Sequence, residues 1–364
     1  MVEKKTIAVI TCYYQPDYVR ARTLRAALQT MPAVEVIIIK NRHRSLLRYP
    51  EVIWKLWRLK HTQEVDAYLL TFRGQEILPL VLWAARKKPV IFDEFIVPLA
   101  YATQEKHAFS FGSWLRHITA RLAQPFYRRW LKRCRWILAD TAAHAVLSAE
   151  ISGISPDTYL VSPVGTDEQL FKPWPPTAYT DIFQVFYYSS GMQPLHGIPI
   201  VLQAAELLKD NPRIRFLLAG GKQPMQRAIK AAQRRGANIE YQRWIPFETL
   251  ISTIHNSGVC LGGPFGDTPQ AHHVITGKTY QFLAAGAPTI IGASDTTNQY
   301  FHDKQNGLVV RQADPQALAD AIIWASQHPQ NLQRIAEKGH LLYSQEFSTT
   351  AIARRLRPLI DQLI

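Results

Sequence analysis

Small residues and one lysine follow apolar runs in the second half of the sequence, a combination suited to holding phosphate. Gly277-Lys278 opens a candidate helix directly after Thr276. A helix start offers unpaired N–H groups and a positive dipole end, and both favour an anion. A capped surface helix with a solvated lysine is the alternative. Small residues also end other apolar runs, where a ligand can approach the backbone: Gly165, Ser189–Gly191, Gly220–Gly221 and Gly262–Gly266.

The elements that would position these residues alternate between short apolar runs and helical stretches. Predicted strands are 6–11, 34–39, 67–72, 89–92 and 136–139, then 184–188, 214–219, 238–241, 258–261 and 289–292. Predicted helices are 18–31, 77–87, 198–209, 224–234, 246–256, 278–285 and 315–327. This alternation predicts α/β doubly wound sheets with ligands at the carboxyl ends of the strands. The 364 residues favour two domains, and the Pro-rich stretch 172–176 favours a linker between them.

The composition points to a globular protein with an anionic partner. The formal charge is +14, and residues 1–175 carry 25 Lys and Arg against 15 Asp and Glu. Residues 114–136 combine Lys and Arg with Trp and Tyr, which suits an anionic membrane surface; an ordinary basic helix face is the alternative. The three cysteines lack metal-ligand spacing, and neither a signal peptide nor a membrane span is predicted, so we expect a cytoplasmic protein.

Five stretches come in the order and spacing of a known family: 163–173, 185–208, 216–221, 263–292 and 306–322. They resemble the retaining GT-B glycosyltransferases of family four, also called glycosyl transferases group 1. The match continues more weakly through 73–76, 90–95 and 136–144. The resemblance implies two Rossmann-like domains facing across a cleft. Residues 1–172 would bind the acceptor, 173–345 would bind the nucleotide-sugar, and a final helix in 346–364 would pack back on the first domain.

The resemblance also implies site residues, with several departures. Many relatives bind the donor pyrophosphate with an arginine and a lysine, which correspond here to Ser190 and His196. We therefore expect the cationic role to pass to Lys278, with His272 and His273 in reserve. The family's paired glutamates align with His273 and Gln281; Gln281 would bond the ribose, and His273 would lie near the sugar. The predicted donor-binding residues are Ser190, Gly191, Gly197, Gly221, His273, Thr276, Gly277, Lys278 and Gln281, and the predicted catalytic residues are Asp93, His196 and Lys278.

Asp93 is the catalytic candidate of the first half. A carboxylate at the end of a strand facing the cleft would orient a sugar hydroxyl or act as a base toward the acceptor. A helix-capping or salt-bridged aspartate is the alternative. Further candidates there are His107, His117 and His144, and Arg20, Arg22 and Arg25 would face an anionic acceptor or water.

The expected function is a metal-independent transfer of a sugar with retention, in polysaccharide or glycolipid biosynthesis. Front-face attack needs no protein nucleophile, and the sequence contains no strand-flanked DxD, no HExxH and no GxSxG motif. No cofactor is expected. The acceptor would be lipid-linked or a glycan, with the protein peripheral at the inner face of the membrane.

The alternatives are a non-catalytic relative that binds a nucleotide or glycan, and a GT-B epimerase or phosphorylase. Nucleic-acid binding is not expected, because no basic-aromatic module is recognised.

Overall fold

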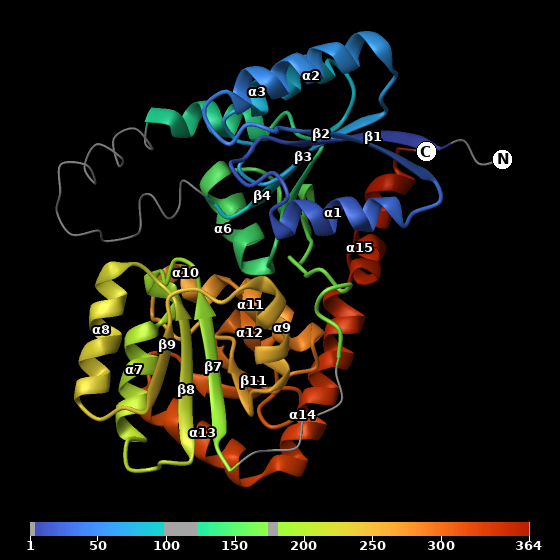
Figure 1. Cartoon of the computed structure of the whole chain (residues 1–364). Helices are drawn as coiled ribbons and strands as arrows, with labels where there is room; N and C mark the ends of the chain where they lie inside the picture. The colour runs from blue at the N-terminus through green and yellow to red at the C-terminus, as the bar shows by residue number, and fades with distance from the viewer. Residues whose placement is uncertain (1–3, 98–121, 174–180, 364) are drawn as a thin grey trace. The chain divides into compact units, whose positions relative to one another are not determined.

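The chain forms two compact units (Figure 1), and the computed structural model describes residues 4–97, 122–173 and 181–363. Unit 1 comprises Met1–Gly165 and Ser348–Ile364, and unit 2 comprises Thr166–Phe347. The division comes before the predicted boundary after Lys172. The backbone N–H of Thr166 already donates to the Tyr343 hydroxyl of unit 2, at 3.2 Å, so the chain enters unit 2 there.

Unit 1 is built on a sheet of six parallel strands in the order β2-β1-β3-β4-β5-β6. Its strands are β1 (Lys5–Thr11), β2 (Val34–Lys40), β3 (Ala67–Leu70), β4 (Val90–Phe95), β5 (Trp136–Ala139) and β6 (Tyr159–Val161). The central strands are continuous apolar runs because helices cover both faces of the sheet. Strand β6 was not predicted, since its three residues are only half-buried.

Helices lie on both faces of this sheet. The core on one face joins α2 (Arg48–Thr62), α3 (Leu78–Ala85) and the helical residues 122–131. The core on the other face joins α1 (Val19–Gln29) and α15 (Thr349–Asp361), the last helix of the chain. α15 begins where the Ser348 hydroxyl accepts the N–H of Ala351, a standard N-cap. The remaining helices of the unit are α6 (Ala142–Ser152) and the 3₁₀ turn Pro156–Thr158.

Unit 2 has a second sheet of six parallel strands, in the order β12-β11-β10-β7-β8-β9. Its strands are β7 (Phe183–Ser189), β8 (Ile214–Gly220), β9 (Ile239–Gln242), β10 (Val259–Leu261), β11 (Thr289–Ala293) and β12 (Leu308–Arg311). Its helices are α7 (Ile198–Leu207), α8 (Gln223–Arg234), α9 (Phe247–His255), α10 (Pro269–His273), α11 (Gly277–Ala284), α12 (Asp295–Asn298), α13 (Pro315–Gln327) and α14 (Pro329–Leu342), with a 3₁₀ turn at Pro194–His196 and a π-helix at Tyr343–Phe347. The strand order reverses between β7 and β10, and such a switch point is where doubly wound sheets bind ligands.

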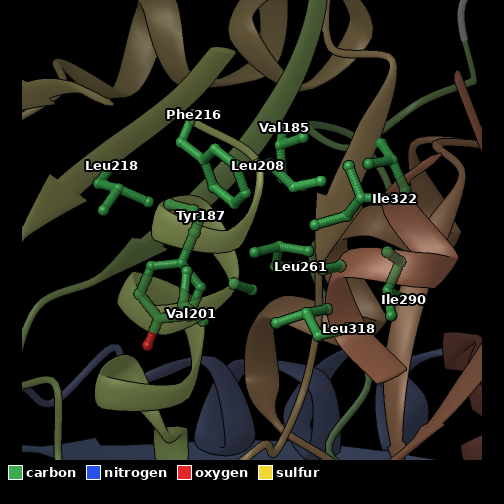
Figure 2. Packing of buried hydrophobic residues seen from close by; sticks show 14 of the residues in the cluster. Val185, Tyr187, Val201, Leu208, Phe216, Leu218, Leu261, Ile290, Leu318 and Ile322 are labelled. Carbon is green, nitrogen blue, oxygen red and sulfur yellow. The ribbon is translucent and has the colours of Figure 1, made fainter. Parts of the chain in front are cut away.

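The largest core of unit 2 holds the strands of this switch point in place. Val185 and Tyr187 of β7 and Leu261 of β10 pack with Val201 of α7 and Ile322 of α13, as Figure 2 shows. The predicted α/β doubly wound class is therefore confirmed for both units. Within the described residues, no helix combines the length and the apolar character needed to cross a bilayer.

Candidate active site

Three segments of unit 2 meet at the switch point: the loop 190–197 after β7, the loop 262–266 after β10, and the start of α11. The backbone N–H of Gly266 donates to the Leu195 carbonyl at 3.0 Å. The Thr276 hydroxyl donates to the Gly262 carbonyl at 2.7 Å. These two bonds join all three segments at the carboxyl ends of neighbouring strands.

Two glycines allow the loops to approach this closely. Gly197 has φ +64°, and a Cβ there would lie 2.4 Å from the Gly266 nitrogen. A Cβ on Gly266 would lie 2.2 Å from the Pro194 carbonyl oxygen. A methyl group at either position would push the two backbones apart. Gly197 therefore shapes the loop that carries His196 by leaving room for the neighbouring backbone. Its predicted contact with the donor stays a prediction.

Lys278 is a buried lysine that has no hydrogen-bond partner among the residues that the structure describes. It is only 6% exposed, and its Nζ lies 4.1 Å from the centre of the Tyr187 ring. No oxygen of the described residues accepts a hydrogen bond from this Nζ. Burial lowers the pKa of Lys278 from 10.5 to about 7. A buried ammonium group that contacts only an aromatic face lacks an anionic partner, and a phosphate would supply one.

His196 is a second polar side chain that the described residues leave unsatisfied. Its Nδ1 is buried and has no hydrogen-bond partner there. Burial, with the nearby positive charge of Lys278, lowers the pKa of His196 to about 3. The imidazole is therefore neutral at physiological pH and can donate one hydrogen bond without adding charge. The structure thus brings two of the three predicted catalytic residues together.

The N-terminus of α11 is open and uncapped. Thr276 makes no side-chain cap, because its hydroxyl bonds Gly262 and lies 3.0 Å from the Thr279 hydroxyl. A Cβ on the exposed Gly277 would meet no atom within 4 Å. The first N–H groups of a helix have no partner inside the helix. Gly277 therefore leaves room for an anion at this terminus, whereas Thr276, predicted to bind the donor, holds two segments together.

Gln281 is already bonded to a neighbour. Its carboxamide oxygen accepts a hydrogen bond from the Tyr188 hydroxyl, and the Tyr188 ring packs on Phe282 at 5.8 Å. The amide N–H₂ is the group of Gln281 that remains suited to a ribose oxygen. Tyr188 is a positioning residue that the sequence did not single out, although it stands at the end of an aromatic strand.

The other predicted donor-binding residues divide by exposure. Ser190 and Gly191 are exposed in the loop after β7, where a ligand can reach them. Gly221 has φ +86°, and a Cβ there would lie 2.6 Å from the sulfur of Met192. The backbone conformation and this close packing are sufficient reasons for a glycine at this position. Of the reserve histidines, His272 pairs with Asp267 at 2.9 Å, and His273 is half-buried at the end of α10.

Gln312 is a further positioning residue. It is buried, and its Nε2 donates to the carbonyls of Pro264 and Ala271, both at 3.2 Å. It thereby connects the loop after β10 to α10. The only sequence signal was its place in the stretch 306–322, which carries the family resemblance but does not distinguish this glutamine.

Asp93 does not have the open position that the sequence suggested. It is fully buried, and its Oδ1 lies 2.8 Å from Nη2 of Arg20. Its Oδ2 accepts the N–H of Phe72 at 3.2 Å. Arg20 also donates to the Pro163 carbonyl at 2.9 Å, so the pair ties β4 to the end of unit 1. This geometry argues against a base and favours the alternative, a salt-bridged structural aspartate.

The other candidates of unit 1 are similarly occupied. His144 is buried, and its Nδ1 lies 2.5 Å from Asp140. Arg25 is buried and pairs with Asp17 at 2.6 Å, so neither it nor Arg20 is free to meet an acceptor. His107 and His117 lie outside the described residues.

Aromatic side chains gather instead at the carboxyl edge of the first sheet. Tyr13 follows β1 and lies 5.7 Å from Phe72, which follows β3; Phe72 lies 4.6 Å from Phe95 at the end of β4. Arg73 and Phe95 both have positive φ, 62° and 56°. Non-glycine residues in this region are strained, and such strain clusters at functional sites. The strand order of this sheet reverses between β1 and β3, so the edge is the counterpart of the switch point in unit 2.

Metal-ligand geometry is lacking in the part of the chain that the structure describes. There, no three His, Cys, Asp or Glu side chains are grouped so that they could hold a metal ion.

Comparison with known proteins gives one family and one fold. Residues 201–357 match the family described as glycosyl transferase-like. No curated protein matches the chain in sequence.

Solved structures match over nearly the whole chain. HepE of Anabaena, in complex with UDP-glucose, is 15% identical with a TM-score of 0.68, covering 98% of this chain and 99% of that one. Sucrose-phosphate synthase of Thermosynechococcus elongatus is 15% identical with a TM-score of 0.71, covering 99% of both chains. A glycosyltransferase of Rickettsia africae is 11% identical with a TM-score of 0.68, covering 100% of this chain and 99% of that one. At these identities the likeness establishes the fold, and the predicted GT-B class is confirmed.

Proposed function

We propose, because residues 201–357 match the glycosyl transferase-like family and the chain has the GT-B fold, that this protein is a glycosyltransferase. It transfers a sugar from a nucleotide-sugar, bound by unit 2, to an acceptor bound by unit 1. HepE has been solved with UDP and with UDP-glucose, and on this ground we propose a UDP-sugar as donor.

The observation that carries the proposal is the unpaired Nζ of Lys278 beside His196 at the switch point. A leaving nucleoside diphosphate gains negative charge in the transition state. Lys278, which the bound diphosphate keeps protonated, supplies a positive charge, and His196 and the open N-terminus of α11 supply hydrogen-bond donors. All three come from segments that hydrogen bonds and backbone contacts join together. They do for this chain what the missing arginine and lysine do in relatives.

The proposed chemistry is front-face attack with retention. The acceptor hydroxyl oxygen bonds to the anomeric carbon as the bond to the diphosphate oxygen breaks. The departing diphosphate oxygen, on the same face, takes the hydroxyl proton, so no protein base or nucleophile is required. Lys278 then holds the charge that develops. Metal independence belongs to this proposal, because a side chain, Lys278, supplies the positive charge of the site.

The acceptor is proposed to be lipid-linked or a glycan. The aromatic edge of unit 1 supports this, since the rings of Tyr13 and Tyr14 offer faces to which an apolar sugar face or a lipid chain can bind. Contact of residues 114–136 with an anionic membrane surface, from the cytoplasmic side, is part of the proposal. Of these, 114–121 lie outside the described residues.

A thermal-shift panel with UDP, GDP, ADP and their sugar conjugates, with EDTA present, tests the donor site. A ligand at about 100 times its Kd stabilises by about 2.7 kcal/mol. We expect a selective shift with UDP and one UDP-sugar, and an α-linked product from an α-linked donor by NMR. Absence of any shift, or a shift that requires metal, would contradict the proposal.

A non-catalytic relative that binds a nucleotide or glycan is the second candidate. The departures at Ser190, His196, His273 and Gln281 favour it. Donor binding without transfer or hydrolysis of the sugar would support this candidate. An epimerase is less well supported, because the segments 189–197, 262–266 and 276–281 contain no Asp or Glu. A phosphorylase would be recognised by the release of a sugar phosphate when inorganic phosphate is added as the co-substrate.

A further inference from the structure

Three tryptophans are exposed on α2 and α3 of unit 1. Trp54 and Trp57 of α2 are 54% and 55% exposed, and Trp83 of α3 is 64% exposed. Trp54 and Trp57 are three residues apart and therefore lie on one side of their helix. When large apolar side chains are grouped on one exposed surface, that surface is usually an interaction site and not an ordinary solvent-exposed one.

The helical residues 122–131 extend this surface. They pack against the same core as α2 and α3, and Figure 1 shows all three helices along one face of the first sheet. Leu122 and Phe126, four residues apart, are exposed on this helix. We call Trp54, Trp57, Trp83, Leu122 and Phe126 the tryptophan face.

Cations are interleaved with the rings of the tryptophan face. The Lys60 Nζ lies 4.4 Å from the centre of the Trp83 ring, and the Arg58 guanidinium lies 5.7 Å from that of Trp54. The stretches 52–63, 77–92 and 122–139 contain no Asp or Glu. The surface therefore combines exposed apolar groups with an excess of positive charge, although Glu51 in the first turn of α2 pairs with Lys55.

A basic cavity opens where α3 and the helix 122–131 end. Its volume is about 810 Å³, and none of the described residues that line it is acidic. Its basic lining residues are Arg86, Lys87, Lys88, Lys132, Arg133 and Arg135. Arg86 comes one residue after α3, whose last turn carries Trp83, so the cavity adjoins the tryptophan face. A cavity with this lining is suited to a phosphate group.

We propose that the tryptophan face docks on an anionic lipid bilayer, with the basic cavity binding phosphate-bearing headgroups. The rings lie at headgroup level, the aliphatic side chains enter the acyl boundary, and the Lys and Arg side chains meet anionic lipid. A nucleic acid would use the cations and stack on the rings, but it would leave the exposed side chain of Leu122 without an apolar partner. The inference adds α2 and α3 to residues 122–136, the described part of the proposed membrane contact, and it requires no sugar transfer.

Flotation of the full-length protein with vesicles tests the inference, without any nucleotide-sugar. We expect binding to vesicles of phosphatidylcholine with phosphatidylglycerol, and little binding to phosphatidylcholine alone. The triple variant Trp54→Ser/Trp57→Ser/Trp83→Ser should bind the anionic vesicles about tenfold more weakly or worse. The matched control is Trp244→Ser, which removes a 73% exposed tryptophan from unit 2 and should bind as wild type.

A second variant tests the cavity and guards against misfolding. Lys88→Gln/Lys132→Gln/Arg133→Gln changes only exposed side chains, and it should lose the preference for anionic vesicles while unfolding at the wild-type temperature. Wild-type vesicle binding by both variants would overturn the inference. So would tryptophan-dependent retention on single-stranded DNA without vesicle binding, or a dimer in sedimentation that the triple variant dissolves. Failure of flotation would leave the donor-binding proposal untouched, because that is measured with soluble ligands.

Discussion

The Lys278 Nζ lies 4.1 Å from the centre of the Tyr187 ring and has no hydrogen-bond acceptor among the described residues. A buried ammonium group against an aromatic face keeps part of its stabilisation through the ring, yet its remaining donors are unsatisfied. The arrangement costs stability in the free protein, and it is preorganised for an anion.

Replacing Lys278 should weaken donor binding. Lys278→Ala removes one charge-assisted hydrogen bond to the diphosphate, which predicts an affinity lower by about 10–100-fold. Calorimetric titration with the nucleotide identified by the thermal-shift panel measures the affinity of the variant and of the wild type. Lys230→Ala, an exposed lysine of α8 in the same unit, is the control and should bind normally. An unchanged affinity in Lys278→Ala would remove Lys278 from the donor site.

The same lysine should make the stability of the free protein depend on pH. Its pKa falls from 10.5 to about 7 on folding, so between these values the unfolded state binds one more proton than the folded state. The free energy of unfolding should therefore rise with pH in that range, by up to about 1.4 kcal/mol per pH unit from this group. Urea unfolding at pH 7 and 9 measures the slope, which Lys278→Met should reduce. Equal slopes in both proteins would show that folding does not lower the pKa of Lys278, and that the side chain keeps its charge in the folded protein.

Donor binding should have the opposite pH dependence. A bound diphosphate raises the pKa of Lys278, so binding takes up a proton above pH 7. The affinity should then fall as the pH rises, by up to about tenfold per unit until the pKa of the complex is reached. Calorimetry in two buffers of different ionisation enthalpy counts the protons. His196, with its pKa near 3, is neutral over this pH range in the free protein.

Asp93 should prove structural. Asp93→Asn leaves the Arg20 guanidinium buried without an anionic partner, and we expect a loss of about 3–5 kcal/mol in the free energy of unfolding. Asp361→Asn is the matched control in the same unit, because Asp361 and its partner Arg357 are both exposed and their pair should contribute less than about 1 kcal/mol. A stable Asp93→Asn protein that binds donor but does not turn over would restore the catalytic-base prediction.

The sequence predicted those parts of the fold that local patterns determine. β5 and α13 have their predicted bounds, because a fully apolar run and an Asp-Pro helix start are unambiguous. α2 and β12 were missed: the former mixes tryptophans with cations, and the latter is a four-residue edge strand. Asp93 was misjudged because its partner, Arg20, lies 73 residues earlier. The helix start at Gly277 drew attention to Lys278, whose donor-binding role stays a prediction, but its contact with the Tyr187 ring could be identified only in three dimensions.

Two glycines of the site should respond oppositely to alanine. A Cβ on Gly266 would overlap the Pro194 carbonyl, so Gly266→Ala should separate the loops after β7 and β10 and weaken both folding and donor binding. A Cβ on Gly277 meets no atom, and alanine is the better helix former, so Gly277→Ala should keep stability or raise it by about 0.5–1 kcal/mol. If a diphosphate sits at the N-terminus of α11, the new methyl group must contact it and lower the affinity. Thermal unfolding and titration of both variants separate these effects. A Gly277→Ala protein with wild-type affinity would place the phosphates away from that helix, and the donor site would then rest on Lys278 and His196 alone.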